Sequence, residues 1–90
     1  MSKEVNLYIR YNKKLKSGKV NVSHGLALKY GLKVGDKLLI KLDDGTGSQE
    51  TMQRAVTIEK VKRLDVGAHI ESSNVRRRID GCLMAYTVEL

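Results

Sequence analysis

The chain has 90 residues and carries 17 Lys and Arg against 10 Asp and Glu, a net charge of +7. That length supports one small domain with a single core, and no apolar run or N-terminal segment suggests a membrane span or signal peptide. The single cysteine, Cys82, has no partner for an internal disulfide, so we expect a reducing cytoplasmic location.

The first half of the chain predicts strands over residues 5–10, 19–22 and 38–42, and a helix over residues 24–30. The strands alternate apolar and polar side chains with a period of two, which is typical of half-buried strands. Ser23 is suited to cap the helix because its hydroxyl accepts an early backbone N–H, and Gly31 is suited to end it.

The second half predicts strands over residues 54–61, 68–70 and 83–90, and a helix over residues 73–79. Ser72 or Ser73 would cap this second helix, and Asp80-Gly81 would form its exit turn. Residues 43–48 are rich in turn formers and lack large apolar side chains, so they predict a linker between the two halves.

The two halves, residues 1–45 and 49–90, repeat one pattern at an offset of 48 or 49 residues. Leu7-Tyr8-Ile9 corresponds to Val56-Thr57-Ile58. A unit of this size repeated only twice is unsuited to an open solenoid. It predicts a mainly β fold in one domain, residues 1–90: a small closed barrel of six strands, built from two strand-strand-helix-strand repeats with two short helices.

Branched aliphatic residues must fill the core of this barrel, because the chain has four Tyr but no Phe or Trp. The residues predicted to be buried there are Leu7, Ile9, Val20, Val22, Leu26, Leu38, Ile40, Val56, Ile58, Ile70, Val75 and Val88.

Positive charge is concentrated in the first half, where residues 1–45 hold ten cations against four acids; residues 46–90 hold seven against six. Clustered cations in equivalent loops indicate a polyanionic partner, although a basic surface that only keeps the protein soluble has the same composition. The candidate nucleic-acid-binding residues are Arg10, Lys13, Lys14, Lys16, Lys19, Lys60, Lys62, Arg63, Arg76, Arg77 and Arg78.

The segment Ser17–Ser23, the short helix after it, and Gly31–Lys37 resemble the core of AbrB/SpoVT-type swapped-hairpin DNA-binding domains. The resemblance covers about residues 12–44, and Gly35-Asp36 is its most specific part. In this turn, Gly permits a positive φ and the Asp carboxylate accepts hydrogen bonds from the turn's own backbone. We therefore expect Gly35 and Asp36 to be structural.

The same unit, fused in duplicate, forms the double-psi barrels found at the N-terminus of archaeal AAA ATPases. The second half resembles that unit through Gly67–Ile70 and Val75–Gly81. Both families belong to the cradle-loop barrel group. The resemblance implies a barrel completed within one chain, and a small transcription regulator that contacts duplex DNA through basic loops.

Motifs of catalysis or metal binding are missing. His24, His69 and Cys82 lack the paired spacing of zinc ligands, and no Gly-rich phosphate loop or nucleophile elbow is found. We therefore expect no enzyme activity, metal or cofactor.

Two binding functions remain as hypotheses. The first is binding of duplex DNA, favoured over single strands because aromatic residues for base stacking are scarce; a homodimer is compatible with it. The alternative is a monomeric double-psi barrel adaptor that binds an acidic protein partner.

Overall fold

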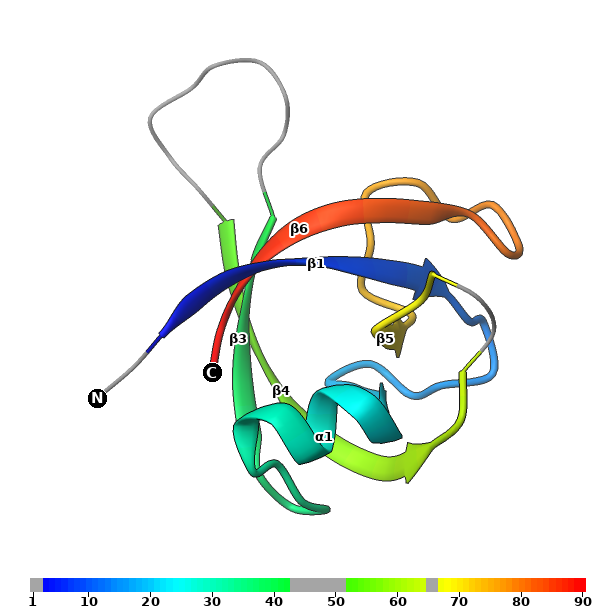
Figure 1. Cartoon of the computed structure of the whole chain (residues 1–90). Helices are drawn as coiled ribbons and strands as arrows, with labels where there is room; N and C mark the ends of the chain where they lie inside the picture. The colour runs from blue at the N-terminus through cyan, green and yellow to red at the C-terminus, as the bar shows by residue number, and fades with distance from the viewer. Residues whose placement is uncertain (1–2, 43–51, 65–66) are drawn as a thin grey trace.

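The computed structural model describes residues 3–42, 52–64 and 67–90; the predicted linker over residues 43–48 lies outside them. Within this part of the chain, six strands form a closed barrel that is accompanied by one short helix (Figure 1). The elements are β1 (Glu4–Tyr11), β2 (Lys19–Ser23), α1 (His24–Tyr30), β3 (Lys37–Leu42), β4 (Met52–Lys62), β5 (Ile70–Ser72) and β6 (Leu83–Glu89). The prediction of a mainly β, six-stranded closed barrel is confirmed.

The strands follow one another around the barrel in the order β1-β5-β2-β4-β3-β6. β5 therefore lies between β1 and β2, and β2 lies between β4 and β5, so each half inserts a strand into the other half. The parallel pairs are β1–β5 and β2–β4, and the other pairs are antiparallel. If β1 is exchanged with β4, β2 with β5, and β3 with β6, the same set of strand pairs results.

The strand register follows the same exchange. Tyr8 pairs with Ala85 between β1 and β6, and Thr57 pairs with Lys37 between β4 and β3. Adding 49 to residue 8 of β1 gives residue 57 of β4, and adding 48 to residue 37 of β3 gives residue 85 of β6. These are the offsets of the sequence pattern. The strand pairing therefore has an approximate two-fold relation that passes through the antiparallel pair of β2 and β5.

The core contains all twelve side chains that the sequence predicted to be buried, each at most 8% exposed. Ten of them come from alternate positions of the strands, which point into the barrel, whereas Leu26 lies on α1 and Val75 in the connection after β5. Tyr86 is also buried, and its hydroxyl accepts a hydrogen bond from the Arg76 N–H (2.8 Å). A buried phenol needs such a partner, so Tyr86 ties the 73–82 connection to the barrel.

α1 has the predicted bounds and the predicted caps. Ser23 Oγ accepts a hydrogen bond from the Leu26 N–H (3.2 Å), and Gly31 ends the helix with a φ of 66°. The helix buries Leu26 and Ala27 and leaves Leu28 exposed. It lies against β2 and β4 (Figure 1).

The second predicted helix, over residues 73–79, does not form: the chain runs there as an irregular connection. A helix would join the Arg76 N–H to the carbonyl of Ser72. The Arg76 N–H instead donates to the Tyr86 hydroxyl, and the Ser72 carbonyl accepts from the Asn12 N–H (3.0 Å). Ser72 Oγ accepts from the Asn74 N–H (2.9 Å), a local turn rather than a helix cap.

The barrel core predicts a large loss of stability on truncation. Ile40 and Ile58 are at most 1% exposed, and Ile40→Ala or Ile58→Ala should each cost about 2–5 kcal/mol, because each leaves a cavity. Leu28→Ala, at a residue 72% exposed, is the control and should change stability by about 0.5 kcal/mol or less. Urea denaturation measures all three. Core variants as stable as Leu28→Ala would contradict this packing.

Candidate nucleic-acid interface

A row of polar side chains crosses four neighbouring strands on the outside of the barrel. Arg10 of β1 is paired with Glu71 of β5, Glu71 with Asn21 of β2, and Asn21 with Lys60 of β4. Arg10, Glu71 and Asn21 each follow a buried aliphatic residue (Ile9, Ile70 and Val20), and Lys60 is itself exposed, so these four positions belong to the outer face. We call Arg10, Glu71, Asn21 and Lys60 the outer row.

Glu71 is the centre of this row and is almost fully buried, with a side chain 4% exposed. Its Oε2 accepts a hydrogen bond from Arg10 Nη2 (2.6 Å), and its Oε1 accepts from Lys62 Nζ (3.0 Å) and Asn21 Nδ2 (3.2 Å). Arg10 belongs to the first half of the chain and Lys62 to the second. The carboxylate therefore joins cations from both halves.

The pKa of Glu71 reflects two opposing effects. Burial raises the pKa of the carboxyl, but the hydrogen bonds from its three partners and the charge of Lys62 lower it by more. The pKa falls from the ordinary 4.5 to about 2. Glu71 is thus a buried anion at neutral pH, and its charge is compensated by Arg10 and Lys62.

The connection between β1 and β2 carries the densest positive charge and crosses the end of β5. The Asn12 N–H donates to the Ser72 carbonyl (3.0 Å), and the Gly18 N–H donates to Asn74 Oδ1 (2.9 Å). Lys13, Lys14 and Lys16 are exposed between these two attachment points. Lys13 and Lys14 line a hollow with Arg10 and Glu71, and Asp80 is a second acid in its lining.

The connection between β4 and β5 is the counterpart, in the second half of the chain, of the β1–β2 connection. The Ser23 N–H, at the end of β2, donates to the His69 carbonyl (2.8 Å). Because β2 and β5 are antiparallel, their ends lie at opposite sides of the pair. The two connections therefore flank the outer row from opposite sides, and the second one begins with the exposed Arg63.

Six of the predicted binding residues belong to one surface around the outer row. Lys19 shares the outer side of β2 with Asn21, and Lys62 reaches Glu71 from β4. We call this surface the basic face: Arg10, Lys13, Lys14, Lys19, Lys60 and Lys62. Lys16 and Arg63 are exposed in the adjoining connections.

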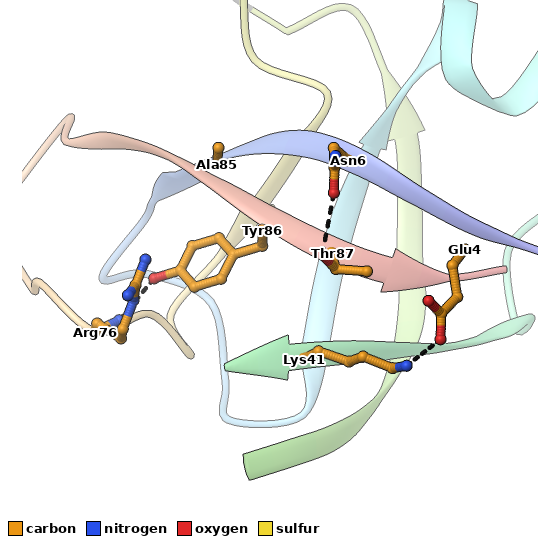
Figure 2. Close-up of a pocket in the computed structure, with 7 residues that line it drawn as sticks. All are labelled: Glu4, Asn6, Lys41, Arg76, Ala85, Tyr86 and Thr87. Atoms are coloured by element: carbon orange, nitrogen blue, oxygen red, sulfur yellow. Dashed lines mark hydrogen bonds and ion pairs between the residues drawn. The ribbon is translucent and has the colours of Figure 1, made fainter. Parts of the chain in front are cut away.

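The arginine triplet lies elsewhere. Arg76, Arg77 and Arg78 are exposed in the connection after β5, and the Arg76 guanidinium lies 5.1 Å from the centre of the Tyr86 ring. Figure 2 shows Arg76 and Tyr86 at one end of a hollow whose other end holds the Lys41–Glu4 ion pair. Arg76 thus lines a different hollow from Arg10, Lys13 and Lys14.

The Gly35-Asp36 turn lies between α1 and β3. Gly35 has a φ of 94°, and Asp36 Oδ2 accepts a hydrogen bond from the Lys33 N–H (3.0 Å). The Gly35 N–H also donates to the Ile58 carbonyl (2.9 Å). The Lys33–Asp36 bond closes the turn, and the Gly35–Ile58 bond attaches it to β4, so both have a structural role.

Sequence reasoning missed four residues of the outer surface: Glu71, Asn21, Tyr8 and His69. Alternation with Ile70 and Ser72 places Glu71 on the outer side of β5, but that pattern does not show its partners. Arg10 and Lys62 lie 61 and 9 residues away along the chain. They meet Glu71 only through the pairing of β1 with β5, of β5 with β2, and of β2 with β4.

No protein-family model, curated protein or solved structure matches this chain. Among the described residues, no cluster of three or more His, Cys, Asp and Glu side chains is arranged to hold a metal ion. In the same part of the chain, no helix has the length and hydropathy needed to cross a bilayer.

Glu71 predicts a specific dependence of stability on pH. Its folded-state pKa of about 2 lies below the ordinary 4.5, so its contribution is present above about pH 4.5 and is lost as pH falls toward 2. Glu71→Gln, which resembles the protonated acid, should destabilise the protein by about 3 kcal/mol at neutral pH. The difference should fall to less than half of this near pH 3, as measured by urea denaturation. An equal difference at both pH values would contradict the buried ion pair.

Proposed function

We propose that this protein binds duplex DNA through the basic face, and that it acts as a small transcription regulator in the cytoplasm. The observation that carries the proposal is the arrangement of the outer row. Cations from both halves of the chain surround one buried carboxylate, and the exposed lysines of the β1–β2 connection and the exposed Arg63 after β4 flank them from opposite sides.

The electrostatics of the basic face suit a polyanion. Glu71, the acid within the outer row, is buried and already compensated by two cations. Lys13, Lys14, Lys19 and Lys60 are exposed, and like charges gathered at this density repel one another. Phosphate groups relieve that repulsion and release counterions when they bind.

The shape of the face supports a duplex as the partner. The approximate two-fold relation of the barrel passes between β2 and β5, directly through the pair of Asn21 and Glu71. A two-fold surface matches the two backbones of a duplex, as symmetric DNA-binding proteins match symmetric sites. Lysine side chains supply point charges to phosphates, so we expect binding that depends little on base sequence.

We also propose that the barrel is of the double-psi, cradle-loop type. The interlocked order β1-β5-β2 and β4-β2-β5 supports this assignment, as does the similarity of residues 12–44 to AbrB/SpoVT-type domains. The irregular connection in place of a second helix is a departure from a strict repeat. A regulator of this type would close its barrel without a partner chain.

Removing charge from the β1–β2 connection tests the proposal. Lys13, Lys14 and Lys16 changed together to Gln should weaken binding to all duplex sequences alike, because each contacts phosphate. The slope of log K against log salt should become less steep by up to about three units. Fluorescence anisotropy at 50 and 200 mM salt, with random-sequence duplexes, measures both quantities.

A control variant loses the same charge elsewhere. Lys3, Lys29 and Lys33 are exposed, and the Nζ atoms of Lys3 and Lys29 lie over the Tyr30 ring at the end of α1. Changing these three to Gln should leave the salt slope nearly unchanged. Equal effects of the two triple variants would show that net charge, and not the basic face, governs binding. The absence of binding by the wild type at 50 mM salt would favour the alternative, an acidic protein partner.

A further inference from the structure

Tyr8 and His69 form a stacked pair on the outside of the barrel. Their ring centres are 6.1 Å apart with an angle of 15° between the planes. The Tyr8 N–H donates to His69 Nδ1 (3.1 Å), and the His69 N–H donates to the Tyr8 carbonyl (2.9 Å). These two hydrogen bonds hold His69 beside the Tyr8 backbone, and Tyr8 remains 49% exposed. A large aromatic ring is thus stacked on His69 and in contact with solvent.

This pair adjoins the basic face. Tyr8 and Arg10 lie two residues apart on the outer side of β1, and His69 and Glu71 are likewise two residues apart along the neighbouring chain. The stacked pair and the Arg10–Glu71 ion pair are therefore consecutive contacts on one surface, roughly 7 Å apart at the rise of a strand. A nucleic-acid backbone held by Arg10 and its neighbours would pass close to the Tyr8 ring.

The ring of Tyr8 has one covered face and one open face. His69 covers the β5 side, whereas on the β6 side the residue opposite Tyr8 is Ala85, a small and exposed side chain. Ala85 also lines the hollow in Figure 2, where Thr87 donates a hydrogen bond to Asn6 (3.0 Å). The open face of the ring thus borders a recess with polar groups.

We infer that Tyr8 is a stacking platform for an unpaired base of the bound nucleic acid, an inference that rests on the proposed function. The base lies on the open face of the ring above Ala85, and Asn6 and Thr87 offer hydrogen-bonding groups to its edge. His69 supports the ring from behind. Because the stack with His69 already favours one orientation of the ring, less conformational entropy is lost when a base stacks on it. The preferred ligand is therefore a duplex that ends in a short single-stranded tail.

Binding of blunt and tailed duplexes tests this inference. Anisotropy titrations compare one labelled duplex that is blunt, that carries a four-nucleotide 5′ or 3′ tail, or that carries the same tail without bases. For the wild type, one of the two tails with bases should tighten binding at least fivefold, roughly the lower bound for a base stacked on an aromatic side chain. The tail without bases should give no such gain.

Two variants test whether the tighter binding of the tailed duplex comes from the Tyr8 ring. Tyr8→Phe keeps the ring and should keep the gain. Tyr8→Ala should lose it while binding the blunt duplex within about twofold of the wild type. A gain that persists in Tyr8→Ala, or with the tail that lacks bases, overturns the inference. Binding of the blunt duplex with no gain from either tail overturns this inference alone, whereas failure to bind any duplex overturns the proposed function as well.

Discussion

The antiparallel pair of β2 and β5 is the constraint on which the rest of the structure depends. Each of these strands lies between the first two strands of the other half, so neither half can close a core without the other. The interlocking obliges the β1–β2 connection to cross the end of β5 and the β4–β5 connection to meet the end of β2. The lysines of the β1–β2 connection and Arg63 after β4 owe their positions to this topology, and they flank one surface for the same reason.

Glu71 gives that surface its particular arrangement of charge. A buried carboxylate is costly unless its charge is compensated, and here the compensation comes from Arg10 and Lys62, which lie on strands of different halves. The same contacts that stabilise the ionised acid hold two cations on the outer side of the barrel. Fold stability and the charge distribution of the proposed binding surface are therefore linked through a single side chain.

Much of the fold follows from local patterns in the sequence. Alternating Val, Ile and Leu predicted the strands and the core, and Ser23 and Gly31 predicted the ends of α1, because these signals act between near neighbours. The prediction of a second helix is wrong because backbone groups that a helix would use bond to distant partners. The Arg76 N–H donates to the Tyr86 hydroxyl, and the Ser72 carbonyl accepts from the Asn12 N–H. The cations of the site could be predicted from the sequence because residue type alone identifies them. The Glu71 network and the Tyr8–His69 pair could not be predicted, because only the fold brings their members together.

The central claim is that duplex DNA contacts the basic face and its two connections. An NMR titration of the isotopically labelled protein with a short duplex tests this most directly, because backbone amide shifts report contacts residue by residue. The account predicts that the largest shifts fall in residues 10–19 and 60–63, with little change in α1. Shifts centred on α1 and Gly31–Lys37, or spread evenly over the barrel, would contradict it.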